Sequence, residues 1–376
     1  MSRPGLSGLT PGELVAWMSD RGERAYRARQ VADALWGQHA TSAEALRTLP
    51  AGLREALVDA FRLDTLGDTT VRPTDGGLTE KALHRLDDGR LVESVLMRYP
   101  ARGARRERAT ACISSQAGCA VGCPFCATGE LGFARDLETA EIVDQVRFWQ
   151  RRLNAEGRRL TNVVFMGMGE PLLNTERVLA AADALTDPRR FGMGARHLTI
   201  STSGVVPGLE RLVAAAPQYT LAVSLHAARP ALRDVLVPLN RRYPVDEVVR
   251  AATAYAAATG RRVSYEVVMI EGINDTPADA SAIAALLRGR LAHVNLIPMN
   301  PVAHTPWQPS RAPRLAAFAA ALRAAGVTTT IRRNRGLEIG AACGQLAAES
   351  AGLPSPTAVA LRRERLARES AAALRA

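Results

Sequence analysis

The sequence predicts an α/β protein whose core is a parallel β-sheet, arranged as an open or closed barrel of βα units. The second half of the 376-residue chain alternates short β-rich runs with longer amphipathic stretches, which is the pattern of such a sheet. A hydrophobic content of 47% at this length allows one large core and one smaller accessory domain. Several β-rich runs end in glycine or polar residues, where parallel βα folds place their ligand sites.

Residues 1–62 are expected to form a helical accessory domain. Apolar residues recur at helical spacing in 11–20, 27–38 and 49–61, with short polar breaks between them. Residues 63–108 are expected to form a β extension, because ALHRLDDGRLVESVLMRY (82–99) has two strand-like runs around an Asp-Asp-Gly turn.

Residues 109–350 are expected to form the barrel. A first strand is predicted at ATACISS (109–115), and six β-rich runs follow it, separated by helical segments. These runs are NVVFMG (162–167), HLTISTSG (197–204), YTLAVSLH (219–226), VSYEVVMI (263–270), HVNLIPMN (293–300) and VTTTIRR (327–333). The tail, 351–376, begins with a Pro/Ser break and continues as an Arg-rich helical pattern, which favours a solvated or frayed terminal helix over a dedicated RNA-binding arm.

The net charge of +11 favours an anionic partner such as nucleic acid. Lys81 is the only lysine, and the near-exclusive use of arginine is explained first by a codon bias, so the choice of Arg over Lys carries little functional weight. No run approaches the roughly 18–20 apolar residues that span a bilayer, and the polar N-terminus lacks a signal core. We therefore expect a cytoplasmic protein without a membrane partner.

The five cysteines point to metal or redox chemistry, because four of them lie within residues 112–126 and Cys343 stands alone. Cys119, Cys123 and Cys126 form a C-x3-C-x2-C triplet in a glycine-containing loop after the first predicted strand. Three thiolates can hold three irons of a [4Fe-4S] cluster and leave the fourth open to a small bidentate ligand. A structural zinc site or a four-ligand cluster needs a fourth ligand, for which Cys112 is the candidate.

This triplet, with Phe125 before its last cysteine, resembles that of the radical S-adenosylmethionine (SAM) superfamily. There, SAM chelates the open iron, and one-electron reduction cleaves it to a 5'-deoxyadenosyl radical. MGMGEP (166–171) resembles the glycine-rich segment that meets the SAM amino group, which places Gly169 and Glu170 at the cofactor. The resemblance implies a partial (β/α)6-type radical SAM barrel.

The chain resembles, over nearly its whole length, the RlmN/Cfr family of radical SAM RNA adenosine methyltransferases. The matching segments include YRARQVADALW (26–36), CISSQAGCAVGCPFCATG (112–129), TISTSGVVPGL (199–209), VSLHAARPALRD (223–234), HVNLIPMNP (293–301) and GAACGQL (340–346). The SAM contacts that the family implies are Gly169, Glu170, Ser201, Ser224, Leu225, His226 and Asn300. Taken singly, the two serines are equally explained as helix caps, Asn300 as a turn residue and His226 as a satisfied core histidine.

The family also implies roles for the two remaining cysteines. Adenine C2 is electrophilic and cannot attack the methyl group of SAM, so the family uses two SAM molecules per turnover. One methylates the counterpart of Cys343, which is by default a small buried hydrophobe, and the second generates a radical that converts this methyl into a methylene joined to RNA. Cys112 matches the cysteine that resolves the adduct through a transient disulfide. Glu93 matches a proton acceptor, although an exposed carboxylate on the β extension explains it equally well.

The implied reaction, as in the RlmN group, is C2 methylation of adenosine 2503 in 23S rRNA and of adenosine 37 in tRNA. NRGLEIGAACGQL (334–346) favours this group, while RRYPVDEV (241–248) has close counterparts in the C8-methylating Cfr group. The implied partners are both RNAs and an electron donor such as flavodoxin or ferredoxin, and we expect a monomer. The basic stretches 21–30 and 101–109 are expected to straddle the RNA, and the family resemblance implies that the N-terminal domain helps to hold the RNA over the barrel mouth. A noncatalytic Fe-S protein that binds RNA is the alternative from another class, and it requires neither Cys112 nor Cys343.

Overall fold

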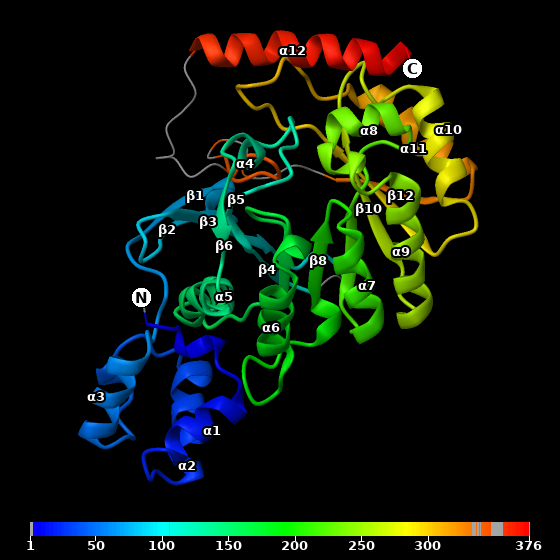
Figure 1. The fold of residues 1–376 in the computed structure, drawn as a ribbon. Coiled ribbons are helices and arrows are strands. Elements are labelled where there is room, and N and C mark those ends of the chain that lie inside the picture. The colour runs from blue at the N-terminus through cyan, green and yellow to red at the C-terminus, as the bar shows by residue number, and fades with distance from the viewer. Residues whose placement is uncertain are drawn as a thin grey trace.

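A ten-stranded sheet organises the protein, in the strand order β1-β2-β3-β4-β7-β8-β9-β10-β11-β12 (Figure 1). The structure, a computed structural model, describes residues 3–104, 106–332, 336, 338, 340–346 and 356–375. In these residues, no helix is long and apolar enough to cross a membrane. The predicted domain boundaries remain predictions.

All neighbouring strands from β4 to β12 are parallel. They are β4 (Arg108–Cys112), β7 (Asn162–Phe165), β8 (Leu198–Thr202), β9 (Thr220–Ser224), β10 (Val263–Met269), β11 (Ala292–Pro298) and β12 (Thr328–Ile331). The helices between them are α5 (Thr139–Asn154), α6 (Thr175–Thr186), α7 (Val206–Ala215), α8 (Pro230–Leu236), α9 (Val245–Thr259), α10 (Pro277–Leu287) and α11 (Ala312–Ala324). The predicted α/β barrel is confirmed and is open, and its parallel part extends one strand beyond six because β12 adds beside β11.

The predicted β extension continues the same sheet. Strands β1 (Thr69–Thr74), β2 (Thr79–Arg85) and β3 (Leu91–Tyr99) form an antiparallel meander, and β3 pairs antiparallel with β4. Gly89, in the predicted turn, has a φ of +80°, which favours glycine. Helix α5 covers one face of the extension, where Trp149 donates a 2.8 Å hydrogen bond to Ser94.

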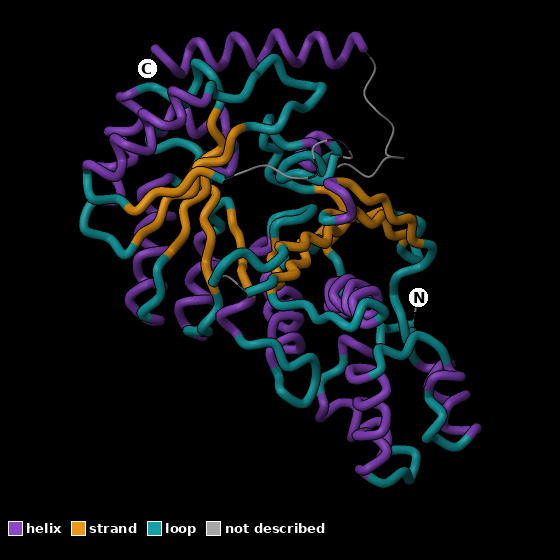
Figure 2. Tube along the Cα trace, turned by 180° about the vertical axis from the view of Figure 1, so that it is seen from behind, coloured by secondary structure: helices purple, strands orange, loops and turns teal. Residues whose placement is uncertain are grey.

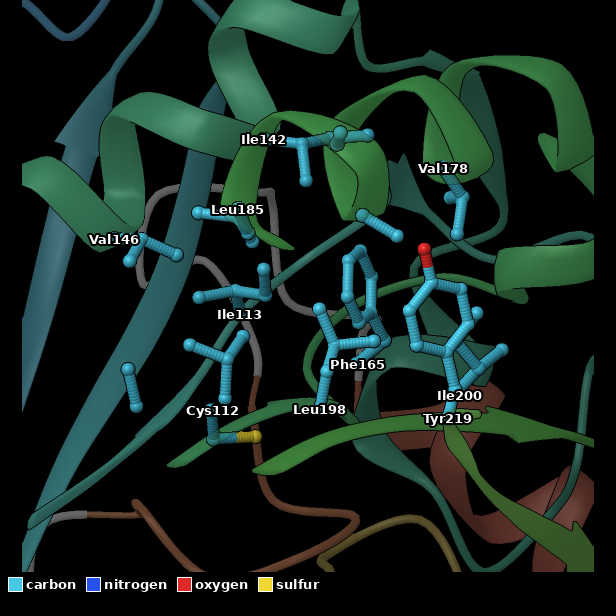
Figure 3. Packing of buried hydrophobic residues seen from close by; sticks show 14 of the residues in the cluster. Cys112, Ile113, Ile142, Val146, Phe165, Val178, Leu185, Leu198, Ile200 and Tyr219 are labelled. Atoms are coloured by element: carbon cyan, nitrogen blue, oxygen red, sulfur yellow. The ribbon is translucent and has the colours of Figure 1, made fainter. Parts of the chain in front are cut away.

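A buried core fills the space between the parallel strands and helices α5 and α6. Neighbouring residues on a strand face opposite sides of a sheet. Ile113 therefore packs among Ile142, Val146 and Leu185, whereas the sulfur of Cys112 points away from them (Figure 3). This alternation leaves Cys112 free to face the interior of the barrel.

The N-terminal helices α1 (Pro11–Ser19), α2 (Ala25–Ala32) and α3 (Ala51–Ala60) form the expected helical module. Arg147 of α5 is fully buried and donates hydrogen bonds to the carbonyls of Leu35, Ala40 and Leu63, which fasten the module to α5. Both views place the module beneath α5, at the end of the molecule away from α4 (Ala127–Glu130) (Figures 1 and 2). This anchoring holds the module at the end of the molecule opposite the cysteine loop, and its expected part in holding RNA remains a prediction.

The C-terminal helix α12 (Pro356–Arg375) packs on α8 and lies across the top of the molecule in Figure 1. Its Leu366 is 2% exposed and belongs to an apolar cluster with Val121 and Phe125 of the cysteine loop. Arg362 forms an ion pair with Glu130 at the end of α4. The helix is therefore docked along one apolar face rather than frayed, while most of its other side chains are exposed, as predicted for a solvated helix. The Pro/Ser break at 352–355 lies outside the described residues.

Candidate active site

The cysteine triplet lies in a loop that a small second sheet closes at its base. Strand β5 (Gln116–Gly118) pairs with β6 (Phe133–Asp136), and Cys119 N–H donates to the carbonyl of Gly132 at 2.8 Å. Gly118 has a φ of +77°, and a Cβ there would lie 1.9 Å from the Gly132 oxygen. Only glycine fits this close crossing, so the sequence of the loop fixes how its three thiols are presented.

The triplet opens into a cavity with an empty volume of about 1000 Å³ at the carboxyl ends of the parallel strands. This is the edge at which βα folds bind ligands. The polar and thiol groups of the lining are those of Cys119, Cys123, Cys126, Glu170, Ser201, Thr202, Ser203, Ser224, His226, Glu266, Asn300, Arg332 and Cys343. The structure thus brings all the predicted cluster ligands and most of the predicted SAM contacts to one cavity.

The donor set of the loop fits an iron-sulfur cluster. Burial raises the pKa of Cys119 to about 12 and also raises the pKa of Cys123 and Cys126, so these thiols need a metal to displace their protons. In the described part of the chain, no three Cys, His, Asp or Glu side chains lie close enough together to hold a single metal ion. A cubane cluster does not require such closeness, because each thiolate binds a different iron. Cys112 does not line this cavity, which disfavours a fourth ligand from that position.

The glycine-rich segment after β7 passes directly beneath the cavity. A Cβ on Gly167 would lie 2.6 Å from the carbonyl of Ile113, and one on Gly169 would lie 2.6 Å from Gln116 Cβ. Gly169 also has a φ of +102°, a conformation that side chains disfavour. Glycine is therefore required at both positions, because this segment passes tightly against the residues that lead into the cysteine loop.

Glu170 ties this segment to the end of β8. One carboxylate oxygen accepts from Leu172 N–H at 3.0 Å, and the other accepts from the N–H and hydroxyl of Ser203, both at 2.7 Å. Burial raises the pKa of Glu170. Since both oxygens are engaged within the protein, the Glu170 side chain holds the cavity wall in shape.

His226 lies at the end of β9 in a left-handed conformation, with a φ of +59°. Its Nδ1 accepts a hydrogen bond from Val268 N–H at 3.1 Å, and burial lowers its pKa to about 3. Its ring packs edge-on against Phe125 at 4.6 Å between centroids. His226 is thus a satisfied buried histidine that also lines the cavity, whereas Leu225 is fully buried and does not line it.

Arg233 was not predicted, and it joins the strand ends that carry Ser201 and Ser224. It is fully buried and donates to the carbonyls of Ser203 and Leu225 at 2.8 and 3.0 Å. Nothing in the local pattern of VSLHAARPALRD (223–234) distinguishes this arginine from an exposed one on a short helix. Its role depends on tertiary contacts.

The segment that carries Cys343 is fastened to the cysteine loop. Gly344 and Leu346 accept hydrogen bonds from Ala127 N–H at 2.7 Å and from the Thr128 hydroxyl at 2.6 Å. The side chain of Asn300 donates to the carbonyl of Cys343 at 2.7 Å. Two cysteines more than two hundred positions apart, Cys126 and Cys343, therefore line one cavity.

A second pocket, with an empty volume of about 550 Å³, adjoins the first and contains both Cys112 and Cys343. Met166, Arg332 and Cys343 line both pockets. Burial raises the pKa of Cys112 to about 12, and the nearby Cys343 raises it further in the same direction. The charge of Cys343 in turn raises the pKa of Arg332, so a cation faces the thiol at the junction of the two pockets.

Glu93 on β3 is fully buried, and its Oε1 lies 3.2 Å from Nζ of Lys81 on β2. The alternative of an exposed carboxylate is therefore wrong. The charge of Glu93 is instead enclosed with a counter-charge.

The basic stretches lie in different places. Within 101–109, Arg108 stacks on Tyr99, 4.1 Å from the ring centroid, and Tyr99 lines the second pocket; Arg105 lies outside the described residues. The exposed residues Arg21, Arg24 and Arg29 belong to the distant N-terminal module. Only the first stretch therefore adjoins the two pockets.

The chain is similar to known radical SAM methyltransferases over most of its length. The profile of the radical SAM superfamily matches residues 113–282. A Parafrankia protein named probable dual-specificity RNA methyltransferase RlmN is 51% identical, over 92% of this chain and 91% of its own length. A Gemmatimonas aurantiaca protein of the same name is 47% identical, over 94% of this chain and 96% of its own length. The crystal structure of a radical SAM methyltransferase from Sphaerobacter thermophilus is 45% identical, covers 92% of this chain and 100% of its own, and has a TM-score of 0.88. This chain belongs to the RlmN family of radical SAM methyltransferases, whose chemistry requires a [4Fe-4S] cluster and SAM.

Proposed function

We propose that this enzyme methylates C2 of adenosine in RNA, at position 2503 of 23S rRNA and position 37 of tRNA. The relatives are named as dual-specificity RNA methyltransferases, and the positive charge suits an RNA substrate. The observation that carries the proposal is the place of Cys343, which lines both the cavity of the cysteine triplet and the pocket of Cys112. A structural Fe-S protein has no need of this shared thiol.

Cys119, Cys123 and Cys126 would hold the cluster, and the strand-end lining would hold SAM. The proposed SAM contacts that face the cavity are Gly169, Glu170, Ser201, Ser224, His226 and Asn300. When bound, the cluster and two SAM molecules per turnover supply a methyl group and a 5'-deoxyadenosyl radical. The reducing electron comes from a donor of the flavodoxin or ferredoxin class, and the enzyme acts as a monomer in the cytoplasm.

Cys343 is the proposed carrier of the methyl carbon. Cys343, which lines both pockets together with Arg332, takes a methyl group on its sulfur and loses the thiol proton. After loss of one hydrogen atom, the S–CH2 carbon bonds to adenine C2. Cys112 then attacks the sulfur of Cys343, so that an S–S bond forms, the S–CH2 bond breaks and the released carbon takes a proton. Before that attack, Glu93 would accept the C2 proton while one electron leaves the adduct radical for the cluster, which restores the aromatic ring. A thiol reductant finally reduces the disulfide and restores the two cysteines.

The covalent step can be tested with single cysteine variants. We expect Cys112→Ala to purify with RNA attached through a nuclease-sensitive link that survives thiols, because a thioether is not opened by exchange. Cys343→Ala and the double variant should carry none. Denaturing electrophoresis after a high-salt wash excludes electrostatic retention. Absence of a nuclease-sensitive shifted band from Cys112→Ala would contradict the role of Cys112.

The position of methylation has its own readout. Mass spectrometry of nucleosides from rRNA and tRNA treated with the reduced enzyme should find 2-methyladenosine. A product of 8-methyladenosine would instead support Cfr-like chemistry.

A further inference from the structure

An open pocket with an empty volume of about 1250 Å³ lies at the edge of the sheet opposite the SAM cavity. It is lined by residues that precede or begin β8, β9, β10 and β11, among them Arg196, Thr220, Arg261, Arg262, Ser264 and His293. The SAM cavity lies at the carboxyl ends of these strands and shares no lining residue with this pocket. We call this separate site the basal pocket.

The charged side chains of the basal pocket are all arginines. Arg196, Arg261 and Arg262 line it, and among the described residues no aspartate or glutamate does. None of the three arginines forms an ion pair within the part of the chain that the structure describes. Burial and the charge of Arg262 lower the pKa of the neighbouring His293. The positive charge of the pocket is therefore left for a bound anion to neutralise.

The three guanidinium groups also keep most of their donors free. An arginine carries several N–H donors in a rigid fork that matches a phosphate group. Within the described residues, Arg261 donates one hydrogen bond, to the hydroxyl of Thr220 at 3.0 Å, and its buried Nε has no partner. The side chains of Arg196 and Arg262 are exposed and donate none to the described residues.

Helix capping does not account for this cluster. Cations often follow a helix because its last carbonyls attract them, and Arg261 and Arg262 follow α9. Helix α9 is already closed by Gly260, whose φ is +67° and whose N–H donates to the carbonyl of Ala256 at 2.9 Å. The guanidinium of Arg261 binds Thr220 on β9 instead.

A polar strip along the edge strand β12 connects the basal pocket to the SAM cavity. Thr328 and Thr330 of β12 are exposed and pair in register with His293 and Asn295 of β11. The Thr330 hydroxyl lies 3.0 Å from Nε2 of His293 and donates to Asn295 at 3.2 Å. Arg332 follows two residues after Thr330 and lines the SAM cavity. A polyanion lying on this strip would therefore reach both sites.

We propose that the basal pocket binds a backbone phosphate of the RNA substrate, away from the target adenosine. Arginine, serine, threonine and glutamine side chains make most protein contacts to phosphate and sugar, and Gln218, Thr220 and Ser264 join the arginines in the lining. No Phe, Tyr or Trp of the described residues lines the pocket, so it lacks the platform on which a base usually stacks. Sites for small molecules are mostly apolar and enclose their ligand, whereas this pocket is open and polar. The inference rests on the proposed function in taking RNA as the substrate.

Binding of full-length tRNA to the reconstituted enzyme tests the proposal. The variant Arg196→Met/Arg262→Met removes two exposed arginines, so the fold should not change. We expect its affinity at physiological salt to fall about tenfold, and the slope of log K against log salt concentration to become shallower by about 2, because two phosphate contacts are lost. An affinity and a slope equal to those of the wild type would overturn the proposal.

Two further variants separate the pocket from bulk charge. Arg177→Met/Arg250→Met removes the same charge from exposed positions on α6 and α9, and it should bind tRNA like the wild type. Arg196→Lys/Arg262→Lys should recover most of the lost affinity, because lysine also binds phosphate as a point charge. Equal losses in the two methionine variants would show that only the net charge matters, and the assignment of the pocket would fail.

The source of the phosphate has its own measurement. Calorimetric titration of the enzyme with inorganic phosphate and with a nucleoside triphosphate should find no micromolar site. A micromolar site that disappears in Arg196→Met/Arg262→Met while tRNA affinity is unchanged would identify a pocket for a free anion and refute the contact with RNA. If tRNA binding depends on the two arginines but the wild type forms no 2-methyladenosine, the proposed function fails while the basal pocket stands.

Discussion

Replacing Arg233 with methionine should loosen the wall of the SAM cavity. The guanidinium is fully buried and donates to the carbonyls of Ser203, Ser224 and Leu225 and to the side chain of Asn240, at 2.8, 3.3, 3.0 and 2.8 Å. It thereby links the loop after β8, the end of β9 and the turn after α8. Methionine fills much of the same length but offers no donor.

The expected loss follows from these bonds. Each intramolecular hydrogen bond contributes about 1 kcal/mol net, so the loss of these four bonds should cost roughly 3–5 kcal/mol. Burial lowers the pKa of Arg233 to about 10. The cost of desolvating the guanidinium therefore already offsets part of the stabilisation that its hydrogen bonds provide. At about 2.1 cal/mol/K per residue, the 376-residue chain has an unfolding entropy near 0.8 kcal/mol/K, so Tm should fall by about 4–6 °C.

Thermal unfolding of the cluster-free protein, followed by circular dichroism, measures this shift. The matched control is Arg211→Met, which removes an arginine that is 61% exposed and pairs with Glu176. Such a surface pair contributes at most about 1 kcal/mol, which corresponds to about 1 °C on the same scale. If Arg233→Met melts within 1 °C of this control, the four buried hydrogen bonds do not hold the strand ends together.

Three further predictions concern other parts of the molecule. Gly169→Ala should weaken SAM binding to the reconstituted protein at least about tenfold in equilibrium dialysis, because its Cβ would lie 2.6 Å from Gln116; unchanged affinity would contradict the close approach. His84 is held neutral down to about pH 3 by burial, which lowers its pKa, whereas the unfolded chain protonates it near pH 6.5. Between these two pH values the unfolded state binds more protons than the folded state, so the free energy of unfolding falls as the pH drops below about 6.5. In urea unfolding, His84→Gln should make the free energy of unfolding less dependent on pH in this range. Leu366→Asp should lower iron retention after anaerobic reconstitution. The control Leu361→Asp, at a residue 62% exposed on the same helix, should not. Equal losses of iron in the two variants would argue that α12 does not stabilise the cysteine loop.

Patterns within a few residues were sufficient to predict much of the fold and the cysteine loop. Strand periodicity and the C-x3-C-x2-C spacing are local properties, and parallel strands bring their carboxyl ends to one edge whatever the details of packing. Ser201, Ser224 and Asn300 were expected at the cofactor because the family resemblance implies it, and they line the cavity. Leu225 was expected there on the same ground, but its side chain is buried and does not line the cavity.

Features set by tertiary packing were not visible in the sequence. Helix α12 packs on an apolar surface that Phe125 and Val121 provide. An Arg-rich helical pattern does not reveal that such a partner surface exists. Glu93 was equally compatible with an exposed strand, because the pairing with Lys81 depends on the register between β2 and β3. The single lysine, first explained by codon bias, acquires a specific environment only once that register is known.

The position of Cys343 is determined from two sides. Toward the cavity, Gly344 and Leu346 accept hydrogen bonds from the helix that follows the cysteine triplet. Toward the β extension, Gly340 covers Lys81, and Gly336 is bound to the β1–β2 hairpin. A methyl carrier must receive its carbon at one site and deliver it at another, and a short segment fastened to both walls keeps its thiol within reach of both. The β extension, which looked peripheral in the sequence, is on this argument part of the active site, because it supplies the second wall.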